Sequence, residues 1–110
     1  MDESRLETGR ANLASQPFSL LLGTELTVLE LGRAGLRLPL RAQLFQQNGF
    51  AHGGVVSYLA DNALTFAGGR ALGEMVLTAE MKINYLRPAT GKTLVARAQI
   101  LSSGRKLAVV

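Results

Sequence analysis

Hydrophobic and polar residues alternate with two different periods along the chain, which predicts both helices and strands. Residues 1–14 are largely polar and predict at most a frayed helix. The apolar run Phe18–Leu22 has Ser15 and Pro17 before it and Gly23 after it. This pattern is typical of a short capped helix with Ser15 as its N-cap.

Two strands and a connecting turn follow this helix. Residues 25–31 suit a strand, and leucines at 36, 38 and 40 alternate with arginine or proline in a second strand. The break from Gly32 to Gly35 predicts a hairpin turn between them. Because Pro39 lacks a backbone N–H, we expect the second strand to have a free edge or a bulge.

A polar cluster at residues 46–49 predicts a loop that leads into a helix over residues 53–67, which Gly68-Gly69 should end. Apolar residues cover most of the circumference of this helix, so we expect it to be buried on nearly all sides. Three of its polar residues lie at four-residue steps and form one narrow stripe: Ser57, Asp61 and Thr65.

The last third of the chain predicts strands. Residues from Met75 to Tyr85 alternate with a period of two, residues 87–91 suit a turn, and residues 93–102 suit another strand. Ser103-Gly104 then begins a hairpin into an apolar run that stops at Val110, so we expect that at least one further strand is missing. The order of elements predicts an α+β fold in which an antiparallel sheet covers one central helix.

Composition limits the function classes. A chain of 110 residues with 47% hydrophobic residues predicts a single domain with one core. Without cysteine and with one histidine, it has neither a disulfide framework nor the ligands of a typical zinc site, so we expect no metal. The mixed charges at the start predict no secretory signal, and no apolar run approaches the roughly 20 residues of a membrane span. We therefore expect a cytoplasmic protein that does not enter membranes.

The net charge of +4 changes this picture little. The twelve lysines and arginines are scattered, and aromatic residues make up only 5% of the chain. A nucleic-acid surface would combine a basic stripe with stacking aromatics, so we expect no nucleic-acid partner. A small polyanion, such as a nucleotide-bearing ligand, fits the charge better.

The segment HGGVVSYLAD, residues 52–61, is the strongest chemical signal. Gly53 and Gly54 leave room for a substrate oxygen to approach free amides at a helix N-terminus, where the helix dipole favours negative charge. Asp61 supplies a carboxylate that could activate water or attack directly, although it could also be a helix carboxylate with only local hydrogen bonds. The combination predicts acyl chemistry, in which a thioester carbonyl becomes an oxyanion.

The spacing within this helix adds a second prediction. At 1.5 Å of rise per residue, Asp61 lies about 12 Å along the axis from the amide of Gly53. One helix cannot bring both groups to one carbonyl, so we expect a two-fold dimer with two composite sites. The same axial argument keeps His52 from pairing with Asp61 within one chain, and we expect the His52 ring to hold the Gly53 turn through a hydrogen bond.

Three segments, Gln46–Gly54, Leu59–Ala63 and Tyr85–Ala89, together resemble the PaaI-type (phenylacetate-degradation) branch of the hotdog-fold acyl-CoA thioesterases. The resemblance runs from Pro17 to Val110. It implies a hotdog fold, in which a long antiparallel sheet wraps around one long central helix after a short N-terminal helix. It also implies homodimers with a continuous sheet, which can pair into a homotetramer. On this interpretation residues 1–110 are one domain with a polar extension at 1–14 and a truncated C-terminal strand.

The resemblance assigns catalytic roles to five residues. Asp61 matches the catalytic carboxylate, as nucleophile or general base, and Gly53 matches the glycine whose amide polarises the thioester carbonyl. His52 matches the histidine that orients the site. Gln46 falls where many members have an asparagine, and Thr78 matches a serine or threonine near the attacking water.

The family hydrolyses acyl-CoA or aryl-CoA thioesters with neither a metal nor a cofactor besides the CoA of the substrate. Arg87 and Lys92 are candidate contacts for CoA phosphates, although each could equally be a solvated charge at a strand end. Further candidate substrate contacts are Asn48, Gly54 and Asn62. Two alternatives remain open: a dimer that binds acyl-CoA or aryl ligands without catalysis, and a hotdog hydratase or dehydratase with His52 as its base.

Overall fold

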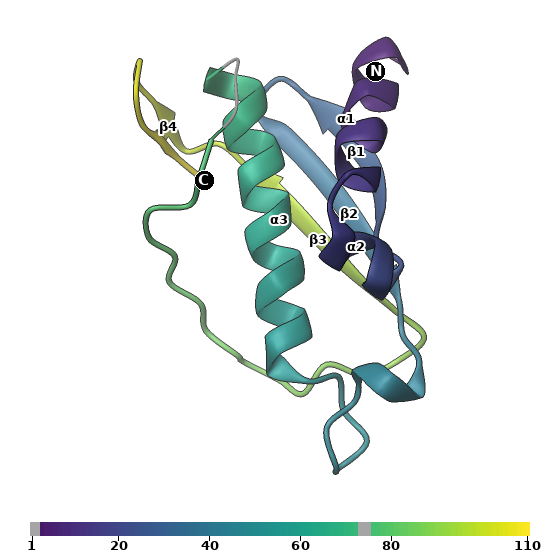
Figure 1. The fold of residues 1–110 in the computed structure, drawn as a ribbon. Coiled ribbons are helices and arrows are strands. Elements are labelled where there is room, and N and C mark those ends of the chain that lie inside the picture. Colours follow the sequence, from purple (N-terminus) through teal and green to yellow (C-terminus); the bar gives the residue numbers. More distant parts are fainter. Residues whose placement is uncertain (1–2, 73–75) are drawn as a thin grey trace.

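The computed structural model describes residues 3–72 and 76–110, and it has the expected α+β architecture of an antiparallel sheet and a long central helix (Figure 1). In chain order the elements are α1 (Glu3–Ala14), α2 (Pro17–Leu22), β1 (Glu25–Glu30), β2 (Arg33–Pro39), the 3-10 helix η1 (Ala42–Leu44), α3 (Gly53–Leu72), β3 (Thr93–Gln99), β4 (Ser102–Ser103) and β5 (Ala108–Val109).

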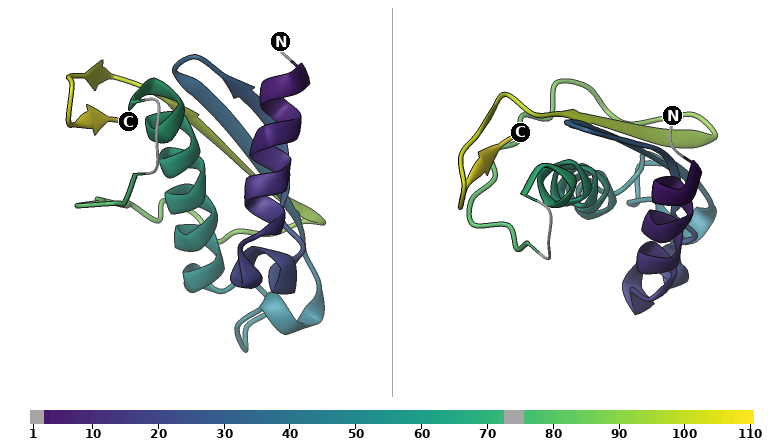
Figure 2. Two further views of the ribbon diagram at one scale, coloured as in Figure 1. Left: turned by 45° about the horizontal axis from the view of Figure 1, so that its top comes forward. Right: turned by 90° about the horizontal axis from the view of Figure 1, so that it is seen from above.

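The main sheet has the order β1-β2-β3, with both pairs antiparallel. Seen from above, α3 and α1 lie side by side on one face of this sheet (Figure 2). The core fills the layer between these helices and the sheet. Its fully buried side chains come from the sheet, as Leu26, Leu36 and Leu38, and from one line along α3: Leu59, Ala63 and Ala67.

Helix α1 is more than the polar extension that the sequence predicts. Its buried residues Leu6, Gly9 and Leu13 form a narrow stripe at helical spacing against β1. The helix approaches so closely at Gly9 that a Cβ atom there would lie 2.6 Å from Leu26 Cδ2 and 2.7 Å from Leu29 Cδ2. The stripe was overlooked because a glycine occupies its centre.

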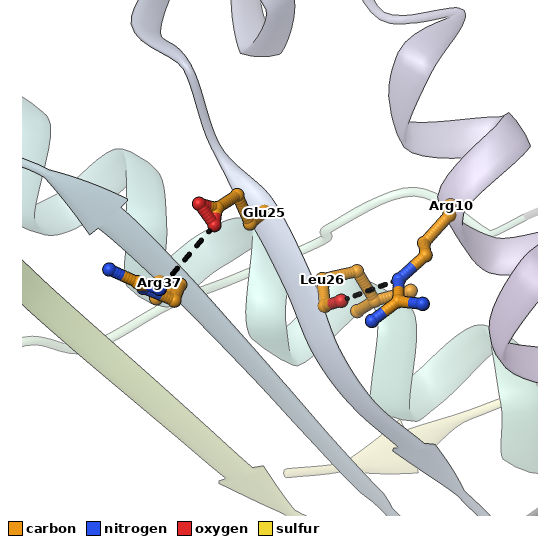
Figure 3. Close-up of polar contacts among 4 residues, drawn as sticks. All are labelled: Arg10, Glu25, Leu26 and Arg37. Carbon is orange, nitrogen blue, oxygen red and sulfur yellow. Dashed lines mark hydrogen bonds and ion pairs between the residues drawn. The ribbon is translucent and has the colours of Figure 1, made fainter.

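Polar contacts fix the edge of the sheet nearest α1 (Figure 3). The Arg10 Nε–H donates to the carbonyl oxygen of Leu26 over 3.0 Å and so ties α1 to β1. On the same strand, Glu25 pairs with Arg37 of β2 at 3.7 Å. This exposed ion pair adds little stability, whereas the backbone contact of Arg10 is partly buried and sets where α1 lies.

The predicted N-cap of α2 was wrong. Gln16 holds this position with extended backbone angles, whereas the Ser15 hydroxyl donates to Asn12 at the end of α1. The turn between the two helices is so short that Ser15 belongs to the first of them. The predicted end is confirmed, because Gly23 has a left-handed φ of 84° and its N–H donates to the Ser19 carbonyl.

The first hairpin is tighter than expected. Its turn lies at residues 31–32, where Gly32 has a φ of 80°, and Gly35 is already inside β2. Strand β2 is the central strand, but β1 begins opposite Arg37, so Pro39 pairs only with Thr93 of β3 and its other edge is free, as expected. Pro39 ends the strand, where its missing N–H disturbs the ladder least, and the irregularity lies on β1 between Leu26 and Val28.

Helix α3 is five residues longer than predicted, because Gly68 and Gly69 continue it as far as Leu72. Neither glycine has a positive φ, and Gly68 is buried, so packing outweighs the helix-weakening effect of about 1 kcal/mol per glycine. The helix is also less enclosed than predicted. Val55, Val56 and Leu64 are only partly buried, since the sheet covers one side of α3 alone.

The strand predicted from Met75 to Tyr85 was wrong for this chain. Met75 lies outside the described residues, and residues 76–86 run past α3 without strand structure. Side-chain burial still alternates from Met81 to Asn84, as the pattern predicts. A strand also needs a neighbour that satisfies its backbone groups, and β1, β2 and β3 pair only with one another.

The strand predicted over residues 93–102 forms as β3 and ends at Gln99. The hairpin predicted at Ser103-Gly104 is confirmed, because β4 pairs with β5 and the Gly104 N–H donates to the Leu107 carbonyl. None of the helices within residues 3–72 and 76–110 is long and apolar enough to cross a bilayer.

Candidate active site

A closed loop delivers the chain to the start of α3. After η1, Phe45 and Ala51 form an isolated antiparallel bridge, and the His52 N–H donates to the Leu44 carbonyl over 2.8 Å. These bonds bring the two ends of the loop together beneath the helix. The position of His52 is therefore set by backbone hydrogen bonds to the residues that precede α3.

The His52 ring caps α3. Its Nδ1 accepts the N–H of Gly54 over 2.8 Å, while its backbone carbonyl accepts the N–H groups of Val55 and Val56. An imidazole that accepts at Nδ1 carries its proton on Nε2, so the exposed side of the ring is a donor. The predicted ring hydrogen bond at this turn is confirmed, although the amide that it holds is that of Gly54.

The amide of Gly53 is left available. Among residues 3–72 and 76–110 we find no acceptor for its N–H, which lies in the first turn of α3, where the helix dipole is positive. A Cβ atom at Gly54 would lie 3.0 Å from His52 Nδ1, whereas one at Gly53 would come no nearer than 3.6 Å to the Tyr85 ring. The cap therefore needs a glycine at 54, but packing within the chain does not need one at 53.

Tyr85 is the residue near this terminus that the sequence analysis missed. Its hydroxyl donates to the Gly53 carbonyl over 3.3 Å, and its side chain is 56% exposed. The Ala89 carbonyl accepts the Ala51 N–H over 2.9 Å, so the segment from Tyr85 to Ala89 runs along the start of α3. The available signal was the aromatic residue at the head of the Tyr85–Ala89 motif.

Asp61 and Thr78 meet in space, although seventeen positions separate them in sequence. The Thr78 hydroxyl donates to Asp61 Oδ1 over 2.5 Å, and this contact is exposed although Asp61 as a whole is partly buried. A hydroxyl bound to a carboxylate orients it and leaves its second oxygen for another donor. Two of the predicted catalytic residues are thus neighbours.

Gly53 and Asp61 stay apart, as their spacing predicts. Both belong to one continuous helix, in which eight residues correspond to about 12 Å along the axis (Figure 1). The group of His52, Gly53 and Gly54 and the pair of Asp61 and Thr78 are therefore two separate clusters within this chain.

Gln46 and Asn48 contact each other rather than the helix start. Gln46 Oε1 accepts the Asn48 N–H over 2.5 Å, and its backbone carbonyl accepts the N–H of Gly49. Gly49 completes this tight turn with a φ of 84°. The amide oxygen that the resemblance assigns to the substrate closes its own loop here, and a catalytic role for Gln46 stays a prediction.

Asn62 lies in a polar network between α3 and α2. Its side-chain amide is 3.2 Å from the Ser19 hydroxyl and from the Tyr58 hydroxyl, and 3.3 Å from Gln16 Oε1. The residue is buried, so these contacts satisfy a group that would otherwise be costly to bury. This placement gives Asn62 a structural role, and its role as a substrate contact stays a prediction.

Arg87 and Lys92 are both exposed on the connection that leads into β3. The Lys92 carbonyl accepts the Leu40 N–H over 2.8 Å, which fixes the backbone while the side chain reaches solvent. Arg87 lies between the two anchor points Tyr85 and Ala89, so its charge is near the start of α3. Lys92 lies further along the chain, at the beginning of β3.

Comparison with known proteins supports this arrangement. The sequence model of a family described as Thioesterase superfamily matches residues 48–110, which include the helix start, Asp61 and Thr78. A relative from Saccharolobus solfataricus that bears an esterase name is 34% identical over 91 residues. The match covers 81% of this chain and 60% of that protein, so the chain spans less than two thirds of that relative.

Solved structures give the same result for the fold. A thioesterase family protein from Silicibacter pomeroyi is 36% identical with a TM-score of 0.82, and the match covers 90% of this chain and 74% of that one. The E. coli PaaI protein from the phenylacetic acid degradation operon is 26% identical, also with a TM-score of 0.82, over 90% of this chain and 72% of that one.

Proposed function

Because this chain belongs to the thioesterase superfamily and has its hotdog fold, we propose that it hydrolyses acyl-CoA or aryl-CoA thioesters to a free acid and CoA. The family resemblance that the sequence predicts is confirmed by the family match and by PaaI proteins among the similar structures. The observation that carries the proposal is the hydrogen bond from Thr78 to Asp61, because Asp61 lies on the same helix that presents the free Gly53 amide.

The cluster around Gly53 and the pair of Asp61 and Thr78 have distinct tasks in this reaction. The Gly53 N–H, aided by the helix dipole, stabilises the negative charge that develops on the thioester oxygen. The Asp61 carboxylate either removes a proton from water as the water oxygen bonds to the carbonyl carbon, or bonds to that carbon itself. The carbon–sulfur bond then breaks, and CoA leaves as a thiolate that takes up a proton. On the second route a water molecule then hydrolyses the mixed anhydride between Asp61 and the acyl group, which releases the acid and restores the carboxylate.

The spacing along the helix favours a site that is built from two chains. Because about 12 Å of helix separates Gly53 from Asp61, the carbonyl held by Gly53 of one subunit would meet Asp61 of the partner subunit. A homodimer would then carry two equivalent sites. The polar stripe of Ser57, Asp61 and Thr65 would line this contact.

The His52 geometry favours hydrolysis over the hydratase alternative. A general base must present a lone pair to the proton that it removes. The Nδ1 lone pair of His52 is occupied by the Gly54 N–H, and Nε2 carries the proton. His52 therefore fits an orienting role better than the role of a base.

The test is CoA release from a panel of aryl and aliphatic acyl-CoA thioesters, with the wild type and Asp61→Asn compared. We expect turnover by the wild type and loss of most of it in Asp61→Asn, with both proteins folded by circular dichroism. Full activity of Asp61→Asn would refute the assignment. Measurable acyl-CoA binding with no release by either protein would instead favour the non-catalytic binding dimer.

Subunit mixing tests the composite site. Gly53→Ala and Asp61→Asn chains, each inactive alone, are unfolded together and refolded as a mixture. Half of the resulting dimers are mixed, and each of these has one site with both intact residues, so about a quarter of wild-type activity should return. A mixture that stays inactive would show that both residues must come from one chain.

A further inference from the structure

A cavity of about 630 Å³ lies between α1 and the C-terminal half of α3, and residues 76–77 close one side of it. Its wall combines apolar side chains with polar and cationic ones. The residues that the argument uses are Arg5, Asn12, Thr65, Phe66, Arg70 and Leu77. Neither the Asp61 and Thr78 pair nor the Gly53 terminus lines it, so its wall is separate from the groups discussed so far.

Two arginines, Arg5 and Arg70, line this cavity, and its described lining contains no carboxylate. The Nε–H of Arg70 is buried and finds no hydrogen-bond acceptor in the part of the chain that the structure describes. A buried donor without an acceptor is costly, and a ligand oxygen is one way to satisfy it.

The cavity begins next to the proposed reaction centre. Thr65 and Gly69 continue the line of Asp61 along α3 in steps of four residues, each about 6 Å along the axis. On the facing segment, Leu77 of the cavity wall directly precedes Thr78, which binds the Asp61 carboxylate. A group attached to a carbonyl at Asp61 can therefore extend into the cavity within one helical turn.

We propose that this cavity binds the acyl group of the substrate and selects acyl chains that end in a carboxylate. The inference rests on the proposed function, because it places the thioester carbonyl at Asp61. Phe66 and Leu77 are apolar residues of the wall that suit methylene groups, and Arg70 lies one helical turn beyond Phe66 along α3. The substrate class is thus the CoA monothioester of a short dicarboxylic acid, held by a charge-assisted hydrogen bond to Arg70.

A CoA phosphate offers similar chemistry, but its position argues against it. The phosphates of CoA are separated from the sulfur by the whole pantetheine arm, whereas the cavity starts one helical turn from Asp61. The acyl side of the thioester is the side with a suitable length. Binding of bare CoA distinguishes the two sources, since only a phosphate contact would involve Arg70 in that complex.

The experiment compares adipoyl-CoA with hexanoyl-CoA, which have the same chain length and differ in the terminal carboxylate. Dissociation constants are measured by calorimetry on the Asp61→Asn protein, and kcat/KM for CoA release is measured on the protein with Asp61 intact. We expect at least about a tenfold preference for adipoyl-CoA in both. Arg70→Met should abolish this preference by weakening adipoyl-CoA, with a much smaller change for hexanoyl-CoA.

Arg33→Met is the matched control, because Arg33 is an exposed arginine at the start of β2. It should retain the preference. Equal affinity for the two thioesters would overturn the inference. So would an Arg70→Met protein whose affinity for bare CoA falls as much as its affinity for adipoyl-CoA. If adipoyl-CoA binds more tightly but neither thioester is hydrolysed, the proposed function fails while the selectivity of the cavity stands.

Discussion

The Thr78 hydroxyl donates to Asp61 Oδ1 over 2.5 Å and so joins the segment after α3 to the middle of that helix. This contact predicts a kinetic effect. Thr78→Val keeps the shape of the side chain but removes the donor, so kcat/KM should fall about 10- to 100-fold, the value of a hydrogen bond to a charged group. Thr78→Ser keeps the hydroxyl and should recover most of the loss in the same CoA-release assay. Equal activity of Thr78→Val and the wild type would separate Thr78 from the reaction.

Gly53 and Gly54 should respond differently to alanine. Gly53→Ala should fold at least as well as the wild type, with a gain of up to about 1 kcal/mol, because its Cβ atom meets only an ordinary contact. Its kcat/KM should nevertheless fall about 10²- to 10³-fold, because the methyl group obstructs the carbonyl.

Gly54→Ala places a Cβ atom 3.0 Å from His52 Nδ1 and should weaken the cap. Urea unfolding should find it about 1 kcal/mol less stable than Gly53→Ala. The reverse order of stability would show that Gly53 is needed for folding rather than for the reaction.

Tyr58 should be a major contributor to stability. Its hydroxyl lies 2.6 Å from the Ser19 hydroxyl, 2.7 Å from the Thr24 hydroxyl and 3.2 Å from the Asn62 amide nitrogen. Tyr58→Phe leaves three partly buried groups with fewer partners and should lower the free energy of unfolding by about 1–3 kcal/mol. Tyr85→Phe removes one exposed hydroxyl and should change it by less than about 0.5 kcal/mol. Similar losses in the two variants would contradict the structural role of the network.

The close approach of α1 to β1 at Gly9 predicts a strong size limit. Gly9→Val forces side-chain atoms against Leu26 and Leu29 and should destabilise the protein by about 1–3 kcal/mol. Ala11→Val adds the same branched side chain on the exposed face of α1 and serves as the control. Thermal unfolding of both variants measures the difference, and equal midpoints would mean that α1 does not pack as described.

The fold class and the main helix could be predicted because their signals are local. The alternating leucines of β2, the glycine after α2 and the apolar residues of α3 each determine a short stretch of backbone. The spacing of Gly53 and Asp61 along one helix follows from helix geometry alone. The pairing of Asp61 with Thr78 had only the family resemblance to suggest it, because the two residues are seventeen positions apart in sequence.

The errors arose where packing between distant segments overrides a local pattern. Gly68 and Gly69 look like a helix end, yet α3 continues through them. The alternation before Tyr85 suits a strand, but strand structure also requires a neighbouring backbone, which a periodic pattern cannot report. Tyr85 and Arg70 were missed for the same reason, since their positions depend on contacts with Gly53 and on the space beside α1.

The unpaired path of residues 76–86 makes assembly measurable without any substrate. Because residues 76–86 form no strand in the described chain, their amide hydrogens should exchange quickly with solvent deuterium. Two leucines of this segment, Leu77 and Leu86, are 91% and 87% exposed. If the segment gains a neighbouring strand when two chains associate, its exchange should slow as the protein concentration rises. The same exposed leucines would then make the isolated chain more prone to aggregation and proteolytic cleavage than the assembled one.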